Sequence, residues 1–301
     1  MSNLKIGLIG GTGIGQALLD GHQGAAHDID TPFGKPSDAI IETQVNGVPV
    51  FLLHRHGPGH LLNPSQVPYR ANIFALKQLG VTHIIASGAV GSLREEFKPR
   101  DLVVVDQLID KTCQRAGTFF DKAAVHVEFA EPFCPLLRNL LLEAGVQLAA
   151  SDSPFHTHDR GCYVVMEGPA FSTRAESLMH RLWGGDLIGM TALPEARLAR
   201  EAEIAYALVA LVTDYDCWKK RPADHTADPA ELLKEIIGHL QAATSNAMTL
   251  IRKTIELATT RQDDLLKSPA VDALQLAIWS EKSRIPADEA LRLKPLWGKY
   301  L

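Results

Sequence analysis

Short apolar runs alternate with helical stretches along most of the chain, and this alternation constrains the fold more than any other feature. Six runs are rich in valine, isoleucine, leucine and alanine, and we interpret them as strands: residues 5–10, 48–53, 82–90, 101–109, 161–167 and 202–214. Most of these runs are too apolar to face water, which is typical of strands covered by helices on both sides. The sequence therefore predicts an α/β fold with a central, mostly buried sheet.

Two segments show the three-and-four spacing of a helix. One face of residues 173–183 carries four apolar side chains: Ala175, Leu178, Met179 and Leu182. A second helix is predicted to begin at Pro229, and its apolar stripe includes Ile236, Leu240 and Ile251.

The sequence predicts one domain followed by a tail. No repeat or low-complexity linker interrupts residues 1–265, which form the predicted domain. Residues 266–301 form a predicted C-terminal helical tail. Its apolar residues predict a short amphipathic helix that packs on the domain or on a neighbouring subunit: Leu291, Leu293, Leu296 and Trp297.

Composition argues against several classes of protein. Thirty basic and 35 acidic residues give a net charge of −5, so there is no basic excess for binding nucleic acid or an anionic membrane. No apolar run approaches the roughly 20 residues of a membrane helix, and we see no signal peptide, so we expect a cytoplasmic protein. The four cysteines lie far apart, which indicates reduced thiols rather than disulfides or a metal site.

A glycine-rich loop, residues 10–15, follows the first predicted strand. It does not match the dinucleotide fingerprint, because Gln16 and Leu18 stand where the third glycine is required. It is not a P-loop either, because Gln16 and Ala17 replace the lysine and the hydroxyl residue. Two alternatives remain: a site where backbone N–H groups and the Thr12 hydroxyl bind an anion, or a turn without a ligand.

The second predicted strand leads into a cluster that contains Arg55, His56 and His60. A zinc site is disfavoured, because no carboxylate accompanies the histidines at a familiar spacing and Arg55 would place a cation beside the metal. An arginine–histidine pair with no nearby acid suits a phosphate, to which arginine offers a bidentate fork and histidine another donor. The alternative is a loop with surface histidines.

Two further strands end in residues that can bind a ligand. The segment around Ala89 ends in small residues and a glycine turn that expose backbone N–H groups. The last strand ends in Asp214 and Asp216, whose side chains point to the same side. This pair can bind a metal, perform acid–base chemistry or accept hydrogen bonds from an amino heterocycle; alternatively it caps a helix or forms a salt bridge. Ligands gather at the carboxyl ends of strands in open α/β sheets, so we expect these residues in one site.

The chain resembles the trimeric purine nucleoside phosphorylase superfamily over roughly residues 4–260. The motifs that carry the resemblance occur in the family's order: IGGTG (9–13), TPFGKPSD (31–38), RHGPGH (55–60), YRANIFALKQLG (69–80), GSLREE (91–96), AEPFCP (130–135), MEGPAFSTRAES (166–177), GMTALPEA (189–196) and TDYDCW (213–218). The resemblance implies a single-domain nucleoside phosphorylase fold with a central mixed β-sheet flanked by helices. It also implies a homotrimer, with a hexamer as the alternative.

The resemblance implies reversible phosphorolysis, in which inorganic phosphate displaces a purine from C1′ of a nucleoside. The expected substrate is 5′-methylthioadenosine, which would give adenine and 5-methylthioribose 1-phosphate. Adenosine, 5′-deoxyadenosine and inosine or guanosine are alternatives. Phosphate is a co-substrate, and neither a metal nor an organic cofactor is implied. A nucleoside-binding protein without activity is a further alternative, and Gln16 disfavours a nicotinamide-dependent oxidoreductase.

The resemblance also assigns roles at the phosphate. Thr12, Arg55, His56 and the backbone N–H of Ala89 would surround it. Thr191 would bridge the phosphate and the ribose.

Other residues are assigned to the nucleoside. Met190 would lie under the ribose, Phe171 would pack beside the sugar and the base, and His60 would also contact the substrate. His126 would reach across a subunit boundary to close the 5′ pocket.

The catalytic assignments are Asp214, Asp216 and His56. The two aspartates would face N7 and the exocyclic amino group of adenine. Carboxylates accept hydrogen bonds, so they suit a 6-aminopurine, whereas relatives that use 6-oxopurines tend to have asparagine at the position of Asp214.

The sequence departs from the family in two places. Many relatives have threonine at the position of Gly88, so one hydroxyl donor to the phosphate is missing here. The family lines the 5′ pocket with apolar residues from the start of the long helix, where this chain has Ala227, Ala230 and Glu231. The preference for the 5′ substituent therefore stays open.

Overall fold

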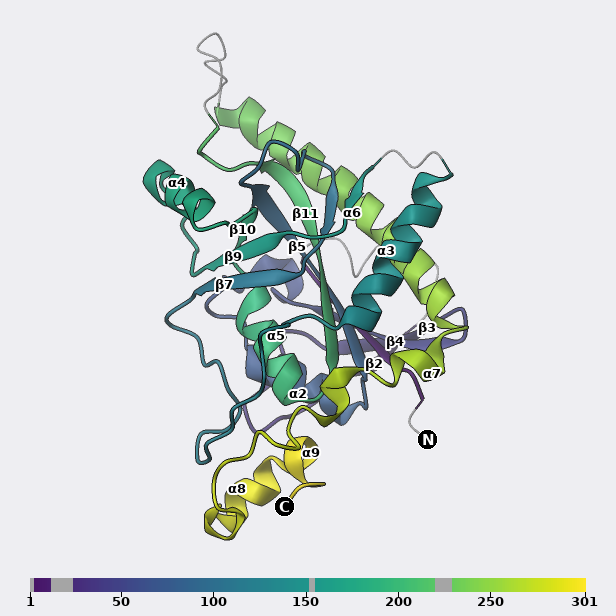
Figure 1. Ribbon diagram of the computed structural model, residues 1–301, viewed down its shortest axis with the longest axis vertical. Coiled ribbons are helices and arrows are strands. Elements are labelled where there is room, and N and C mark those ends of the chain that lie inside the picture. The colour runs from purple at the N-terminus through teal and green to yellow at the C-terminus, as the bar shows by residue number, and fades with distance from the viewer. Residues whose placement is uncertain (1–2, 12–23, 152–154, 220–228) are drawn as a thin grey trace.

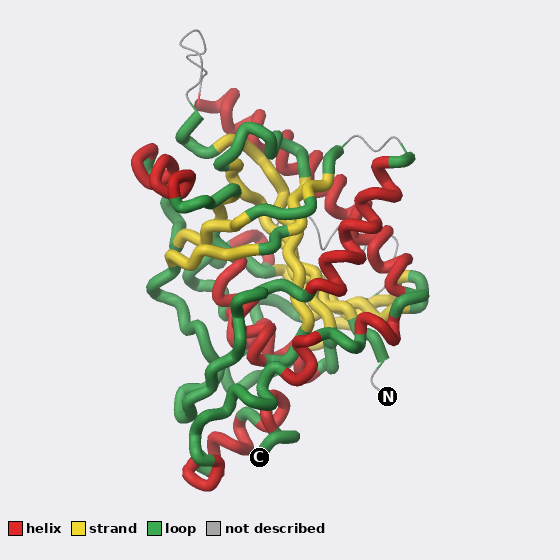
Figure 2. Tube along the Cα trace, viewed as in Figure 1, coloured by secondary structure: helices red, strands yellow, loops and turns green. Residues whose placement is uncertain are grey.

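The computed structural model describes residues 3–11, 24–151, 155–219 and 229–301 (Figure 1). Helices lie on both sides of a strongly twisted central sheet, and the C-terminal segment packs at one end of the molecule (Figures 1 and 2). This arrangement confirms the predicted α/β class with a mixed sheet between helices.

The sheet has 11 strands in the order β2-β3-β4-β1-β5-β10-β9-β7, with β11 paired to β5 and β6, and β8 paired to β6. The strands are β1 (Ile6–Gly10), β2 (Ala25–His27), β3 (Ile40–Val45), β4 (Val48–His54), β5 (His83–Ser92), β6 (Leu102–Val104), β7 (Gln107–Lys111), β8 (Thr157–His158), β9 (Cys162–Met166), β10 (Leu187–Gly189) and β11 (Ala205–Tyr215). One prediction was wrong. Residues 101–109 form two strands, because β6 pairs with β11 whereas β7 pairs with β9.

Four neighbouring strands, β4, β1, β5 and β11, run parallel. Their carboxyl ends therefore meet at one edge, where the backbone N–H of Arg55 donates to the carbonyl oxygen of Gly10 at 3.0 Å. β10 runs antiparallel to β5 and pairs with it only at Gly91 and Ser92. The long β5 thus pairs with β1, β10 and β11 and connects the segments that meet at this edge.

β11 shows why its sequence is apolar throughout. Alternate side chains enter the core on opposite faces of the sheet: Tyr206, Leu208, Ala210 and Val212 on one, and Ala205, Ala207, Val209 and Leu211 on the other. Both faces of this strand are therefore removed from water, as expected where helices cover a sheet on both sides.

Two pairs of helices form the layers. α2 (Tyr69–Gln78) contacts α5 (Ala192–Glu201) on one face, and α3 (Pro135–Ala149) contacts α6 (Pro229–Ala258) on the other (Figure 1). The remaining helices are α4 (Arg174–Leu182), α7 (Gln262–Leu265), α8 (Ala287–Arg292) and α9 (Lys294–Trp297), with 3-10 turns η1 (Pro58–His60), η2 (Pro269–Asp272) and η3 (Lys282–Arg284). None of the described helices is long and apolar enough to cross a membrane.

α4 forms where the spacing predicted it and begins with a capping box between Thr173 and Glu176. Its apolar stripe, however, points away from the core, because Leu178 is 48% exposed and Leu182 is 87% exposed. The buried side of the helix instead carries polar residues, among them Ser177. A stripe that the chain itself does not cover is available to another molecule.

The C-terminal tail packs on the domain of its own chain. Trp297 is fully buried, and its ring lies 4.8 Å from that of Phe120. Glu203 holds the end of the tail by an ion pair with Lys299 at 2.8 Å and a hydrogen bond from Tyr300. Leu291 stays 72% exposed.

Candidate functional site

A cavity of about 1000 Å³ opens at the carboxyl ends of β1, β4, β5 and β11. It brings together nine of the residues predicted from the sequence: Arg55, His56, His60, Ala89, Phe171, Met190, Thr191, Asp214 and Asp216. These residues come from five separate parts of the chain, so their convergence follows from the order and direction of the strands.

Two predicted site residues are not in this group. Thr12 lies outside the described residues. His126 is described but does not line the cavity. It is exposed, its ring lies 4.6 Å from that of Trp279, and its backbone N–H donates to the carbonyl of Ala277 at 2.9 Å. Trp279 is itself 72% exposed, so the two rings form an outward-facing surface.

Arg55 is buried and already forms a bidentate ion pair. Its Nε and Nη2 atoms donate to the two carboxylate oxygens of Glu195 at 2.7 and 2.9 Å, and Nη1 donates to the carbonyl of Ser87 at 2.8 Å. The expectation of an arginine with no nearby acid and a free fork was therefore wrong. A fourth hydrogen bond, from Nη2 to the carbonyl of Ile9 at 3.5 Å, leaves one of the five N–H groups, on Nη1, for a ligand.

Glu195 makes this buried charge tolerable. It accepts a hydrogen bond from the hydroxyl of Tyr206 at 2.8 Å in addition to those from Arg55. Burial alone would lower the pKa of Arg55, but the carboxylate of Glu195 raises it above the ordinary value. Arg55 is therefore charged, and its remaining N–H group is a charged hydrogen-bond donor at this end of the cavity.

His56 is a neutral ring of fixed orientation. Its Nδ1 lies 2.8 Å from the carbonyl of Leu62, which only accepts hydrogen bonds, so Nδ1 carries the proton. Burial, together with the nearby Arg55 and His60, lowers the pKa of His56 to about 4, against the raising effect of that carbonyl. At neutral pH its Nε2 is thus a hydrogen-bond acceptor, and it donates to an anion only after taking up a second proton.

Asp214 and Asp216 stand together at the end of β11, as the alternation of the strand predicts. The Thr213 hydroxyl donates to Oδ2 of Asp214 at 2.7 Å. Oδ2 of Asp216 is buried without a hydrogen-bond partner among the described residues. A Cβ atom on Gly91 would lie 3.3 Å from the Cβ of Asp216 and 3.4 Å from Oδ1 of Asp214, so the missing side chain makes room for both carboxylates.

The buried arginine and the two aspartates lie at different positions along β5. Arg55 contacts the carbonyl of Ser87, whereas the aspartates lie against Gly91. Four residues of a strand span about 13 Å. The cavity therefore has one end with a buried cation and a second end with two carboxylates, at a separation that a nucleoside-sized molecule with a neighbouring anion can bridge.

α6 forms one wall of the cavity, but with residues other than those that the sequence predicted for the 5′ pocket. Ile236, Leu240 and Thr244 line the cavity, one turn apart along the helix. The predicted apolar stripe contained Ile236 and Leu240, but neither was assigned to the site. Ala230 and Glu231, the expected pocket residues at the helix start, are exposed and do not line the cavity. Ala227 lies outside the described residues.

The chemistry of the site is that of hydrogen bonds and charges from side chains and backbone. Within the described ranges, no group of three histidine, cysteine, aspartate or glutamate residues is arranged to hold a metal ion. The four cysteines of the chain form no disulfide, and Cys113 is exposed.

Residues 5–256 of the chain match the model of the phosphorylase superfamily. The chain is 48% identical to an S-methyl-5′-thioadenosine phosphorylase of Synechocystis sp., with 100% of this chain and 89% of the relative covered. It is 46% identical to the protein of the same name from Thermosynechococcus vestitus, over 99% of both chains.

Solved structures give the same result. A methylthioadenosine phosphorylase from an antarctic soil metagenomic library superposes with a TM-score of 0.87 at 44% identity, over 98% of this chain and 99% of the other. The methylthioadenosine phosphorylase of Schistosoma mansoni, without ligand, superposes with a TM-score of 0.81 at 34% identity, over 92% of this chain and 99% of the other.

Proposed function

This chain belongs to the phosphorylase superfamily, and we propose that it is a phosphorylase that converts 5′-methylthioadenosine and inorganic phosphate reversibly to adenine and 5-methylthioribose 1-phosphate. The observation that carries the proposal is the presence of a fixed cation and two carboxylates in one cavity, separated along β5. Relatives at 46–48% identity over nearly the full chain bear the name of this activity.

Phosphate binds at the end of the cavity that holds Arg55. The remaining Nη1–H of Arg55, the backbone N–H of Ala89 and the hydroxyl of Thr191 are the donors there, with Thr12 as a further donor from the glycine loop. Thr191 lies beside Gly88, because a Cβ on that glycine would be 3.3 Å from its hydroxyl oxygen. This position supports the proposed role of Thr191 between the phosphate and the sugar.

The base binds at the end that holds Asp214 and Asp216. A carboxylate there accepts a hydrogen bond from the 6-amino group of adenine, which a 6-oxopurine cannot donate. Oδ2 of Asp216 has no partner among the described residues and so is available to the base or to its proton. A carboxyl group at N7 delivers the proton that the departing purine requires.

The reaction then needs only groups that bind and orient. As the bond from C1′ to N9 breaks, positive charge develops on the sugar and negative charge on the purine. The phosphate, held by Arg55, stabilises the sugar cation and forms the new bond to C1′, while the purine takes its proton at N7. We therefore propose that the enzyme uses neither a metal ion nor an organic cofactor.

The 5′ substituent is proposed to be the methylthio group. Ile236 and Leu240 give the cavity an apolar wall, which suits a thioether better than a hydroxyl group. Adenosine is the second candidate, because a Schistosoma mansoni relative at 34% identity is described as an adenosine/methylthioadenosine phosphorylase.

We further propose that the enzyme is a homotrimer in the cytoplasm, with a hexamer as the alternative, and that its products enter purine and methionine salvage. The exposed stripe of α4 supports subunit contacts. The exposed pair of His126 and Trp279 supports the assignment of His126 to the 5′ pocket of a neighbouring subunit. Light scattering coupled to size exclusion measures the subunit number directly.

The test of the reaction is base release from 5′-methylthioadenosine, adenosine, 5′-deoxyadenosine and inosine, each with and without phosphate. We expect release only with phosphate, and fastest from 5′-methylthioadenosine. Faster release from adenosine would keep the mechanism and reassign the 5′ pocket. Release from none of the four would overturn the proposal.

A further inference from the structure

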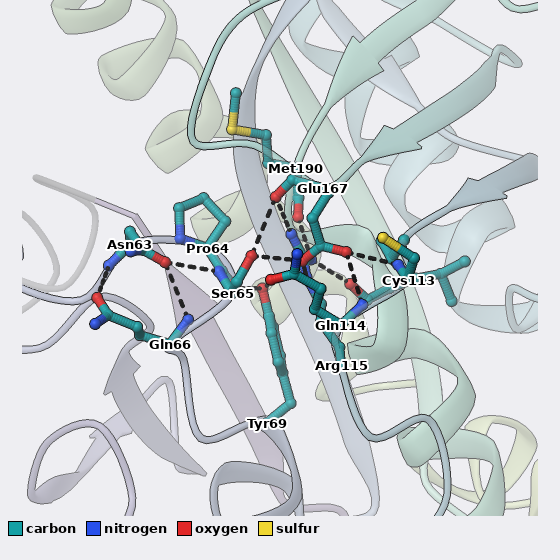
Figure 3. A network of polar contacts seen from close by, with 12 residues as sticks. Asn63, Pro64, Ser65, Gln66, Tyr69, Cys113, Gln114, Arg115, Glu167 and Met190 are labelled. Carbon is teal, nitrogen blue, oxygen red and sulfur yellow. Dashed lines mark hydrogen bonds and ion pairs between the residues drawn. The ribbon is translucent and has the colours of Figure 1, made fainter.

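A buried arginine outside the cavity holds the segment that carries Met190 and Thr191 (Figure 3). Arg115 follows β7, and its side chain is only 1% exposed. Its Nη1 atom donates to the carbonyl oxygens of Met190 and Leu193, the latter at 2.7 Å. These two carbonyls flank Thr191, so one guanidinium group fixes the backbone on both sides of it.

The segment needs such a donor because it is not regular helix. Thr191 precedes α5 without capping it through its side chain, and Leu193 within the first turn is extended, with φ −120° and ψ 144°. The turn therefore lacks helical geometry where it leaves the cavity. A buried carbonyl without a donor is unfavourable, so Arg115 stabilises this turn by supplying donors that helical hydrogen bonding does not provide there.

Glu167 holds Arg115 in place. Its carboxylate accepts from Nε of Arg115 at 3.0 Å and from the backbone N–H groups of Cys113 and Gln114 at 2.6 and 3.2 Å, and it also accepts from the Ser65 hydroxyl. Its backbone carbonyl accepts from Nη2 of Arg115 at 2.6 Å. Figure 3 shows these groups converging from separate segments of the chain.

The carboxylate of Glu167 stays ionised in this setting. Burial on its own would raise the pKa of Glu167, but the hydrogen bonds from Ser65, Cys113, Gln114 and Arg115 together lower it to about 2. The pair with Arg115 is therefore charged throughout the neutral range.

The next residue controls the side chain of Met190. Gly168 has a φ of +69°, and a Cβ atom placed on it would lie 2.5 Å from the sulfur of Met190. The thioether thus packs directly on the backbone beside Glu167. Residues 167–168 therefore act on Met190 in two ways. Glu167 holds Arg115, which binds the backbone of Met190, and Gly168 packs against the Met190 side chain.

We propose that Arg115 and Glu167 are positioning residues that set the geometry of Met190 and Thr191 toward the sugar and the phosphate, without touching either substrate. The proposal rests on the proposed function for the roles of Met190 and Thr191. Neither Arg115 nor Glu167 lines the large cavity. A displacement of about 1 Å in groups that orient the reactants costs on the order of 100-fold in rate, so a distant clamp of this kind affects turnover.

The test compares Arg115→Met, Arg115→Lys and Glu167→Gln with Arg138→Met. Arg138 is a matched control, because it donates to the carbonyls of Val105 and Asp159 at 2.9 and 2.7 Å on the other side of the molecule. We expect Arg115→Met to raise the KM for phosphate and to lower kcat/KM about 100-fold. We expect Arg138→Met to lower the Tm and to leave the KM for phosphate and the KM for the nucleoside unchanged.

The conservative variants keep the test decisive if Arg115→Met does not fold. Lysine keeps the charge but not the planar fork that reaches Glu167 and two carbonyls together, so Arg115→Lys shows the same change in KM to a smaller degree. Glu167→Gln does so as well. Wild-type KM values in both of these variants would overturn the proposal.

A double-mutant cycle with Thr191→Ala identifies the path of the effect. If Arg115 acts through Thr191, Arg115→Met lowers kcat/KM by a much smaller factor in the Thr191→Ala background than in the wild type. Equal factors in both backgrounds, with a lowered Tm, would show a structural role only and overturn the proposal.

Hydrogen exchange separates this inference from the proposed function. The backbone amides of residues 190–193 and 195 are expected to exchange faster in Arg115→Met and in Arg115→Lys, and at the wild-type rate in Arg138→Met. Unchanged exchange in both Arg115 variants would overturn the positioning role. If the wild type releases no purine, the proposed function fails, and the exchange measurement still decides whether this pair holds the segment.

Discussion

Two parts of the cavity are built differently: the end that holds Arg55, where we propose that phosphate binds and which we call the phosphate end, and the outer part around Phe171 and the start of α4, which we call the mouth. At the phosphate end, Arg55 and Glu195 are each 1% exposed and paired with each other, and Thr191 is 8% exposed. At the mouth, Phe171 is 86% exposed, and Leu182, at the far end of α4, is 87% exposed. One end is completed by the chain's own core, and the other presents apolar surface to solvent.

This difference shows which part of the cavity a single chain can complete by itself. A charge such as Arg55 is stable in the interior only when its partner is fixed, so the phosphate end had to be built from the core outward. The apolar surface of α4 has no such requirement and is typical of a surface that another protein covers. The phosphate end therefore depends on folding, whereas the mouth presents a surface that another molecule can cover.

The largest expected effect is at the carboxylates, where Asp214→Asn keeps the shape and removes the charge. The amide oxygen still accepts from the Thr213 hydroxyl, so the fold is retained. We expect kcat/KM for 5′-methylthioadenosine to fall by about 10²- to 10⁴-fold, because acid–base assistance at the base is lost. The ratio of inosine to 5′-methylthioadenosine turnover should rise.

The control for this variant is Asp121→Asn, which alters a surface ion pair with Arg70. It should leave turnover unchanged. Unaltered kinetics in Asp214→Asn would remove this residue from the base site and would leave the cavity with only one chemically specialised end.

The second prediction separates folding from phosphate binding at Arg55. Arg55→Met leaves Glu195 buried without its cation, which costs about 3–5 kcal/mol in the free energy of unfolding. The double variant Arg55→Met/Glu195→Leu should recover much of that loss, because no lone charge remains. Its phosphate saturation should stay impaired. Urea unfolding and phosphate KM measure the two effects, and a double variant with a normal phosphate KM would show that Arg55 is structural only.

The phosphate end was largely predictable from the sequence because its residues follow strands. Arg55 and Ala89 stand where apolar runs end, and parallel strands bring such ends together. Glu195 could not be found this way. It lies 140 positions from Arg55 in the sequence, and no local pattern marks the pair. Arg115 was missed for the same reason, since its partners lie in segments that meet only in the folded chain.

The mouth was predictable only in part. Spacing placed Leu178 and Leu182 on one face of a helix, but spacing does not say whether that face packs on its own core or on another chain. In α6 the same limit applied. Ile236 lies on one stripe with the fully buried Leu250, yet it lines the cavity, because the start of the helix extends past the core.

The third prediction tests whether α4 is a subunit contact. Leu182→Glu places a charge on a side chain that the chain itself does not cover, so the fold should be unaffected. If α4 lies in an interface, we expect association to weaken by about 2 kcal/mol, which light scattering detects as a lower mass on dilution. Val146→Glu is the matched control, because Val146 is 71% exposed on α3. An unchanged mass in Leu182→Glu would show that α4 is not a contact between copies of this chain.

The smallest effect, Gly88→Thr, would strengthen the phosphate end. Gly88 lies in β5, where threonine is favourable, and among the described residues a Cβ there meets only the Thr191 hydroxyl oxygen, at 3.3 Å. The new hydroxyl would add one donor beside Thr191. A net hydrogen bond contributes about 1 kcal/mol, so the KM for phosphate should fall about fivefold. Gly88→Val has the same shape without the hydroxyl and should not lower it. An equal fall in both variants would trace the gain to packing, whereas no fall in Gly88→Thr would mean that the anion does not bind between Gly88 and Thr191, and the phosphate end would have to be sought elsewhere along β5.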